Sequence, residues 1–288
     1  MLGGFKVRKC VVLADPRDPV KARVIQKAME EITPAMERHG IEVESMIGYA
    51  VEFIRPSEDT DLFLVLGGDG TMIHFAARLS NWDIPFYGLN YGNVGFMMNG
   101  TRGDLERHAR NIAEGTFIMW EFPVLHVRSL DLHGTIHEGF GLNDIYLQRM
   151  TPQSCKVNIT IASDSLNINP VLCDGVIVST PLGSTAYSFN VTGMIAAIHA
   201  PVISLTPVAA SRTCPISSMV LPEDTFIKFD ILEPEKRRVQ VVTDGQSHGG
   251  LIEAEVRVSK HRVRLCFEKE YSDNLPIRFI NKACVSPR

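Results

Sequence analysis

The sequence predicts a two-domain protein in which an α/β domain is followed by a β-rich domain. The chain has 288 residues, about twice the usual size of a single domain. In its first third, short apolar runs alternate with segments of helical periodicity, which is typical of a parallel sheet covered by helices. Beyond residue 120 the pattern changes to alternating short runs rich in β-branched residues, which indicate the strands of a β-rich domain.

The elements of the first domain follow from apolar runs and helical spacing. Buried strands are expected at residues 10–14, 41–46, 62–66 and 84–89, where the apolar residues are almost continuous. Helices are expected at residues 20–39, 71–79 and 105–112. Pro34 should kink or divide the first helix, and Gly40 and Gly115 should end the first and the third.

The second domain is expected to consist of short strands with one helical interruption. The strands are at residues 125–128, 145–147, 157–161, 175–179, 226–231, 239–243, 256–259 and 263–267. A helix is expected at about residues 184–200. The predicted domains are therefore residues 1–122 and residues 123–270, and the C-terminal tail 271–288, which is too short to be a domain, should pack against one of the two.

Composition excludes several classes of protein. Lysine and arginine total 29 against 33 acidic residues, a formal charge of -4, so no basic field indicates binding to nucleic acid or to an anionic membrane. The six cysteines have no metal-ligand spacing and no CxxC, which favours reduced thiols and no bound structural metal. The apolar run after the basic N-terminus is too short for a signal peptide or a membrane span. We therefore expect a soluble, cytoplasmic protein.

The most informative segment is GGDGT at residues 67–71, between a buried strand and a helix. Glycines let the backbone approach a ligand, and the N–H groups at a helix start attract phosphate. The segment lacks the lysine of a Walker A loop. Asp69 beside such an anion site would be costly unless it binds Mg²⁺ or takes a proton from an attacking hydroxyl, which are the two uses of a carboxylate in phosphoryl transfer. A plain turn is the alternative.

Three further segments carry polar groups at strand ends. Asn143 and Asp144 open a strand and could hydrogen-bond a ribose or a base, although a simple turn is equally compatible with them. Residues 174–187 (DGVIVSTPLGSTAY) lead from an acid through a buried strand to a hydroxyl-rich helix start, which suits a polar ligand or an ordinary cap. TDGQ at residues 243–246 first indicates a type I′ hairpin turn, and only Gln246 suggests more.

Other enzyme classes lack their motifs. The nine histidines form no HxxxH or HExxH pair, and no GxSxG is present, so a zinc hydrolase or a serine esterase has no support. The glycines at residues 88–95 are wrongly spaced for GxGxxG, which disfavours a dehydrogenase.

Taken in this order, the segments resemble those of the NAD kinase family, whose members transfer the γ-phosphate of ATP to the adenosine 2′-hydroxyl of NAD to make NADP. The resemblance covers nearly the whole chain. It rests on GGDGT at 67–71, GLNYGNVGF at 88–96, LND at 142–144, DGVIVSTPLGSTAY at 174–187 and TDGQ at 243–246. GGDGT alone also occurs in lipid kinases and phosphofructokinases, so the series as a whole makes the resemblance specific.

The resemblance implies the NAD kinase-like two-domain fold, in which the C-terminal tail 271–288 joins the first domain, residues 1–122. It also implies an ATP-dependent enzyme that needs Mg²⁺ with ATP, and a homodimer or homotetramer. Asp69 would be the general base. The ATP phosphates would be bound by Gly67, Gly68, Gly70, Thr71 and Asn90. The NAD site would comprise Phe96, Asn143, Asp144, Asp174, Thr185, Ala186, Tyr187, Asn190 and Gln246.

The sequence departs from the family pattern on the acceptor side. Where family members commonly have TPTGSTAY, this chain has TPLGSTAY, so Leu182 stands at a position where a hydroxyl is common. Where they have SxGGP, this chain has a segment with Thr192 and Met194. The Pro-His pair expected near residues 206–219 is also missing. Two alternatives therefore stay open: a kinase of the same fold acting on another nucleoside or nucleotide hydroxyl, and a non-catalytic nucleotide-binding regulator. A lipid kinase is disfavoured, because no basic amphipathic helix is evident.

Overall fold

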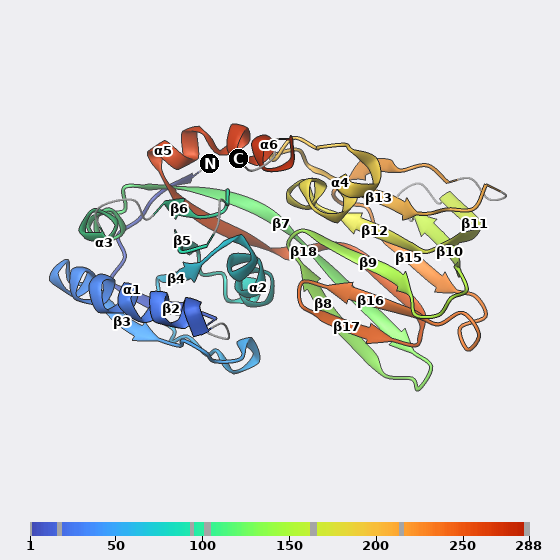
Figure 1. The fold of residues 1–288 in the computed structure, drawn as a ribbon, viewed down its shortest axis with the longest axis horizontal. Helices are drawn as coiled ribbons and strands as arrows, with labels where there is room; N and C mark the ends of the chain where they lie inside the picture. Colours follow the sequence, from blue (N-terminus) through green and yellow to red (C-terminus); the bar gives the residue numbers. More distant parts are fainter. Residues whose placement is uncertain are drawn as a thin grey trace. The chain divides into compact units, whose positions relative to one another are not determined.

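A computed structural model describes residues 2–15, 19–92, 95–100, 105–161, 166–212 and 216–284. The chain divides into two compact units, Met1–Phe122 with Arg262–Arg288 (the first unit) and Pro123–His261 (the second unit). Figure 1 shows both ends of the chain, the blue N-terminal strands and the red C-terminal helices, which belong to the first unit. No helix in the described residues is long and apolar enough to span a membrane.

The first unit contains a parallel sheet whose strand order is β18-β5-β4-β2-β3. Its strands are β2 (Lys9–Ala14), β3 (Glu42–Ser45), β4 (Leu62–Gly67), β5 (Phe86–Asn90) and the end of β18 (Leu251–Glu268). Two very short strands, β1 (Leu2–Gly3) and β6 (Asn99–Gly100), pair with the start of β7 (Phe117–Asp131) and with β5. The strands β2, β4 and β5 are almost completely buried, as continuous apolar runs predict.

The helices of the first unit are α1 (Pro19–Arg38), α2 (Asp69–Leu79), α3 (Leu105–Glu114), α5 (Lys269–Asp273) and α6 (Leu275–Cys284), with short 3₁₀ helices at Val51–Phe53 (η1) and Ser80–Trp82 (η2). Pro34 lies within α1 and does not divide it. Gly40, with φ of 75°, ends α1 in a Schellman motif, in which the N–H of Ile41 donates to the carbonyl of Met36 at 3.0 Å.

The second unit consists of two antiparallel sheets. One contains β11 (Leu166–Cys173), β10 (Cys155–Ile161), β15 (Ile227–Ile231) and the first part of β18. The other has the order β14 (Met219–Pro222), β13 (Val202–Val208), β12 (Gly175–Ser179), β9 (Asp144–Arg149), β16 (Val239–Thr243) and β17 (Gln246–Gly249). A hairpin of β7 and β8 (Ile136–Gly141) completes the unit. Alternate residues of both sheets share one apolar core, which confirms the predicted β-rich half.

Four expectations about elements are wrong. The helix expected at 184–200 is only a 3₁₀ turn, η3 (Leu182–Thr185), and α4 (Tyr187–Thr192), because Gly193 in the left-handed region (φ 68°) ends it. The strands expected at 256–259 and 263–267 are one strand, β18. The helix expected from Thr71 begins at Asp69. The hairpin at 243–246 has its two-residue loop, but it is not type I′, because a positive φ occurs at Gly245 and not at Asp244.

The boundary between the predicted domains also differs from the boundary between the units. Residues 262–270 lie with the first unit and not with the second. The reason is that β18 pairs with β15 through residues 253–256 and with β5 through residues 265–266. One continuous strand therefore contributes to both units, and no linker composition marks the change.

Candidate functional site

The GGDGT segment forms the junction between β4 and α2. Gly67 ends the strand, Gly68 is extended and precedes the helix, and Asp69 is the first helical residue. A Cβ at Gly67 would lie 2.5 Å from the hydroxyl oxygen of Thr71, so glycine leaves the space that this side chain occupies. Because the first N–H groups of a helix have no acceptor within it and carry the positive end of its dipole, this junction can bind phosphate oxygens.

The carboxylate of Asp69 is held by three donors. Its oxygens accept the N–H groups of Phe96 and Met97, each at 3.1 Å, and the Lys282 ammonium lies 3.5 Å away. The side chain of Asp69 is only 11% exposed. These contacts explain how an acid is tolerated at this nearly buried position, since its charge is compensated within the first unit.

The second glycine-rich segment lies beside the first. Asn90 ends β5 opposite Gly67 in register, its side-chain oxygen accepts the N–H of Gly92 at 3.0 Å, and Tyr91 donates its N–H to the carbonyl of Gly67 at 2.7 Å. A Cβ at Gly95 would overlap the Asp69 carboxylate. Two predicted motifs thus form one structure around Asp69, although Asn93 and Val94 lie outside the described residues.

The C-terminal helix α6 supplies groups that sequence reasoning missed. Arg278 donates to the carbonyls of Gly95 and Met98 at 3.2 and 2.8 Å, and Lys282 lies 4.6 Å above the ring of Phe96. Phe96 is buried and meets Phe279 edge to face. The ring of Phe96 thus contacts Lys282 and Phe279, and its role in the NAD site stays a prediction. No local signal marks Arg278 or Lys282, because these partners, Asp69 and residues 95–98, lie 180 or more residues away in the sequence.

In the second unit, two predicted motifs meet at one end of β12. Asp144 pairs with Ser179 in register, and the carbonyl of Asn143 accepts hydrogen bonds from the backbone N–H and the hydroxyl of Thr180, at 2.9 and 3.2 Å. A Cβ at Gly183 would overlap the backbone carbonyl of Asn143. Glycine is therefore required where the TPLGSTAY turn crosses Asn143.

Asp144 is buried, and its environment favours the neutral acid. Burial, and then the charge of Asp244, raise the pKa of Asp144 to about 7, while a hydrogen bond from the backbone of Tyr187 opposes the shift. Asp244 itself accepts the N–H of Leu142 at 2.5 Å. In TDGQ the structure thus brings Asp244 to the site, whereas Gln246 is exposed on the hairpin. The sequence gives no sign of this contact of Asp244, because Asp-Gly is a common turn pair.

We expect Asp144→Asn to change the pH dependence of stability. A pKa of about 7 in the fold against about 3.9 in the unfolded chain means that the native state holds the proton more tightly. This contribution to stability is complete below about pH 4, is lost as pH rises through about 7, and amounts to on the order of 4 kcal/mol. Urea unfolding of the ligand-free protein at pH 5 and pH 8 should show a smaller loss for the variant than for the parent.

The exposed acid Asp224 of the same unit gives the control for this prediction, since Asp224→Asn should leave the loss of stability unchanged. If the parent and Asp144→Asn lose stability in parallel between pH 5 and pH 8, Asp144 does not titrate in this range.

Asp174 lies at the other end of β12. It forms an ion pair with Arg149 (Nε to Oδ1, 2.8 Å) and borders a pocket of about 520 Å³ that Tyr187 also lines. Since β12 separates Asp174 from Asp144 by five strand residues, the two acids are about 16 Å apart. Tyr187 also meets Tyr146 edge to face, with ring centroids 5.1 Å apart. The second unit therefore carries acidic side chains at both ends of β12.

The remaining predicted residues lie around α4. Ala186 precedes the helix and donates its N–H to the carbonyl of Gly183 at 2.9 Å, and the Thr185 hydroxyl bonds the carbonyl of Leu182 at 3.1 Å. Both side chains are half-buried, and Asn190 is exposed. The structure thus gathers Thr185, Ala186 and Tyr187 near Asn143 and Asp144, while Asn190 and Gln246 lie on the surface.

The departures on the acceptor side have local explanations. Leu182 is 1% exposed and belongs to the core of the second unit. The Thr192 hydroxyl donates to the carbonyl of Ser188 at 3.0 Å and accepts the N–H of Met194 at 3.1 Å, so it fixes the end of α4. Leu182 and Thr192 therefore serve packing and helix termination in this chain.

Comparison with known proteins decides the family. Residues 17–117 match the model of the ATP-NAD kinase N-terminal domain, and residues 142–265 match that of the ATP-NAD kinase C-terminal domain. The chain belongs to the ATP-NAD kinase family. An NAD kinase of Rickettsia bellii is 32% identical over 216 residues, which are 75% of this chain and 83% of that protein.

Solved structures of the ATP-NAD kinase family share the fold. An NAD kinase from Archaeoglobus fulgidus in complex with ATP superposes with a TM-score of 0.70, at 22% identity, over 94% of this chain and 98% of that one. Yeast NADH kinase complexed with NADH gives a TM-score of 0.75, at 21% identity, over 98% and 89%. The predicted family and the predicted two-domain fold are thus confirmed, and the roles of individual residues stay predictions.

Proposed function

We propose that this chain is an ATP-dependent NAD kinase that transfers the γ-phosphate of ATP to the adenosine 2′-hydroxyl of NAD, giving NADP and ADP. Membership of the ATP-NAD kinase family, with both domain models matched, supports the kinase activity, the donor and the acceptor. The observation that carries the chemistry is Asp69 at the first position of α2, with both carboxylate oxygens fixed by backbone N–H groups.

Asp69 would act as the general base. The 2′-hydroxyl oxygen forms a bond to the γ-phosphorus, the bond from that phosphorus to the bridging oxygen breaks, and Asp69 takes the hydroxyl proton. A carboxylate has about four lone-pair positions, so hydrogen bonds to Phe96 and Met97 leave room for this proton. The first N–H groups of α2, with Gly67, Gly68, Gly70, Thr71 and Asn90 around them, would hold the phosphates of ATP.

The second unit would hold NAD. The polar groups at the two ends of β12 suit an elongated dinucleotide, with Asn143 and Asp144 at one end, Asp174 at the other, and Thr185, Ala186 and Tyr187 beside them. Donors of a bound ribose or adenine would favour the ionised form of Asp144. Because Leu182 is buried in the core, it does not argue for an acceptor other than NAD.

The proposal also covers the magnesium ion, the oligomeric state and the cellular compartment. Among the described residues no group of three or more acidic, histidine or cysteine side chains could hold a metal ion. Mg²⁺ would therefore be bound chiefly by the phosphates of ATP, as is usual for this ion, and would neutralise phosphate charge. We further propose a homodimer or homotetramer that works in the cytoplasm.

The test is incubation of the purified protein with ATP, Mg²⁺ and either NAD or NADH. NADP is measured with a strictly NADP-dependent dehydrogenase and ADP is measured in parallel. We expect NADP and ADP in equal amounts. ADP without a phosphorylated dinucleotide would contradict the proposal and favour another acceptor. Neither product, with NAD still raising the melting temperature, would favour a nucleotide-binding protein without catalysis.

A further inference from the structure

Two cysteines of the second unit face each other at the corner of a sheet. Cys155 is the first residue of β10 and Cys173 the last residue of β11, and they occupy opposite positions in the antiparallel register. Both are buried free thiols, and the thiol of Cys173 is hydrogen-bonded to the sulfur of Cys155. Among the cysteines that the structure describes, no other two are register partners.

This geometry allows a disulfide to form. Residues directly opposite each other in an antiparallel ladder have Cα atoms about 4.5–5.5 Å apart, which lies within the range of about 4.4–6.8 Å for disulfides. Their Cβ atoms are about 4.5–5.5 Å apart, whereas a disulfide holds them about 3.8 Å apart. Closing the bond would therefore draw the end of β11 toward β10 by about 1 Å.

The pair lies where the sheet can open and move. β11 is an edge strand of its sheet, and Cys155 with Cys173 forms the last register pair of β11 with β10. Residues 151–154, before β10, form no regular element, and Pro152 and Gln153 are exposed. Strand ends of this kind open locally at low cost in free energy, so a molecule as small as hydrogen peroxide can reach the two buried thiols.

Asp174 links the pair to the proposed NAD site. It is the single residue between β11 in one sheet and β12 in the other. Its carbonyl accepts the thiol of Cys155 at 3.7 Å and the N–H of Arg149 at 3.0 Å. Its carboxylate pairs with Arg149 and borders the pocket of about 520 Å³. A movement of Cys173 therefore moves Asp174 as well, because one peptide bond joins them.

We propose that Cys155 and Cys173 form a redox-sensitive pair: hydrogen peroxide converts them to a disulfide, which displaces Asp174 and weakens the binding of NAD. The identity of the affected ligand rests on the proposed function. Disulfides in a reducing compartment are usually transient and redox-sensing, and reduction of this one restores the position of Asp174.

The two thiols have different parts in the reaction. The hydrogen bond from Cys173 lowers the pKa of Cys155 from its ordinary value, and the same hydrogen bond, together with burial, raises the pKa of Cys173. The Cys155 thiolate attacks one oxygen of hydrogen peroxide, the O–O bond breaks, and the other oxygen leaves as hydroxide, which takes a proton to become water. Cys173 then gives up its proton and attacks the sulfur of the sulfenic acid. The S–O bond breaks, a second water leaves, and the disulfide forms.

The first test is whether this bond forms. The reduced full chain is treated with hydrogen peroxide, the excess is removed with catalase, free thiols are alkylated, and the unreduced tryptic peptides are analysed by mass spectrometry. We expect a cross-link between peptides 150–156 and 157–212, which carry Cys155 and Cys173, and its loss after treatment with dithiothreitol. No cross-link, or one that joins other cysteines, would overturn the proposal.

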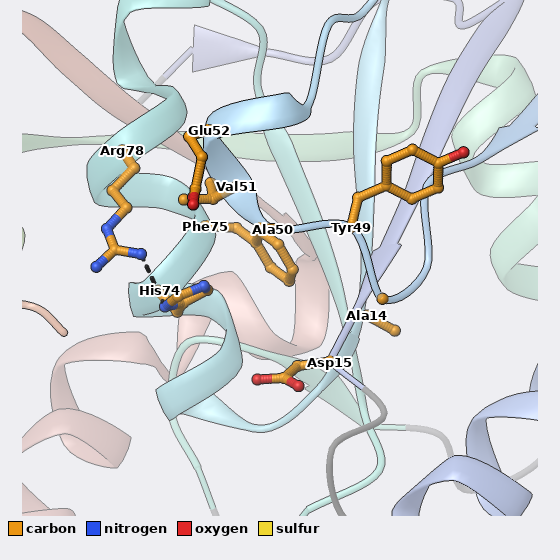
Figure 2. A pocket seen from close by; sticks show the side chains of 10 residues that line it. Ala14, Asp15, Tyr49, Ala50, Val51, Glu52, His74, Phe75 and Arg78 are labelled. Carbon is orange, nitrogen blue, oxygen red and sulfur yellow. Dashed lines mark hydrogen bonds between the residues drawn. The ribbon is translucent and has the colours of Figure 1, made fainter.

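The second test is the effect on the two ligands. We expect oxidation to raise KM for NAD by about 10- to 100-fold, which corresponds to the loss of one hydrogen bond to a charged group. KM for ATP should not change, because the GGDGT junction lies in the first unit. Figure 2 shows the pocket of about 310 Å³ beside α2 in that unit, and none of the described residues that line it is a cysteine. An unchanged KM for NAD in the cross-linked protein would contradict the proposal.

Cys155→Ser and Cys284→Ser are the matched variants. Serine at position 155 keeps a donor for the carbonyl of Asp174 but cannot form a disulfide, and Cys284 is an exposed thiol outside the pair. We expect peroxide to leave KM for NAD unchanged in Cys155→Ser and to raise it in Cys284→Ser as in the parent. The reverse result would assign the response to Cys284. Cys173→Ala gives the same test if Cys155→Ser does not fold.

Binding of NAD, measured by calorimetry before and after oxidation, separates this proposal from the proposed function. If the parent forms no NADP but the cross-link weakens NAD binding, the redox-sensitive pair is supported and the proposed function fails. If the parent forms NADP and the cross-link leaves NAD binding unchanged, the proposed function holds and the pair has no control over Asp174.

Discussion

Replacing Asp69 with asparagine is expected to lower kcat by about 10²- to 10⁴-fold, because the variant loses its general base. The amide keeps one oxygen for the N–H of either Phe96 or Met97 and turns its NH₂ group toward the other. The lost hydrogen bond should cost about 1–2 kcal/mol of unfolding free energy, so the variant stays folded. Steady-state kinetics and urea unfolding on the same preparation separate the two effects.

Asp83→Asn is the matched control for this prediction. Asp83 belongs to the same unit, its side chain is 79% exposed, and its φ of 54° is one that asparagine adopts readily. We expect turnover of this control to equal that of the parent. Near-normal turnover of Asp69→Asn would remove Asp69 from the role of base and leave it as an acceptor that fixes residues 96–97.

The second large effect is expected for Gly183→Ala. The added methyl group would overlap the backbone carbonyl of Asn143, which already accepts two hydrogen bonds from Thr180. Because a backbone carbonyl cannot rotate away as a side chain can, the turn must move. We expect a loss of about 2–4 kcal/mol in unfolding free energy and, since Asn143 and Asp144 shift together, a raised KM for NAD in the fraction that folds.

Gly249→Ala is the matched control, because it also replaces a glycine of the second unit with alanine. Its methyl group would meet only the far end of Met150, an exposed and flexible side chain that can move away at little cost. Equal stabilities of the two variants would show that the turn at Gly183 accommodates a side chain, contrary to the geometry described above.

Much of the fold could be predicted from the sequence, because its signals are local. Buried parallel strands such as β4 are apolar throughout, and Gly40 and Gly115 mark helix ends through backbone conformations that glycine adopts freely. The extent of α4 could not be predicted, because Gly193 ends it within a segment whose apolar residues would equally suit a longer helix. In β18, a polar segment conceals the continuity of one long strand.

The candidate site likewise has a part that the sequence predicts and a part that it does not. Motif order identified Asp69, Asn143, Asp144 and Asp174, since glycine turns and strand ends are visible in the sequence. Lys282 and Arg278 were missed because they contact Asp69 and residues 95–98 only through tertiary packing of α6.

The central claim is tested most directly by following the γ-phosphate of ATP. With [γ-³²P]ATP, Mg²⁺ and NAD, the account predicts that the label enters the 2′-phosphate of NADP, one per molecule of ADP formed. It also predicts that Asp69→Asn, folded as judged by urea unfolding, transfers the label at least about 100-fold more slowly. Label that appears only as inorganic phosphate, or that reaches NADP equally fast in Asp69→Asn, would contradict the account.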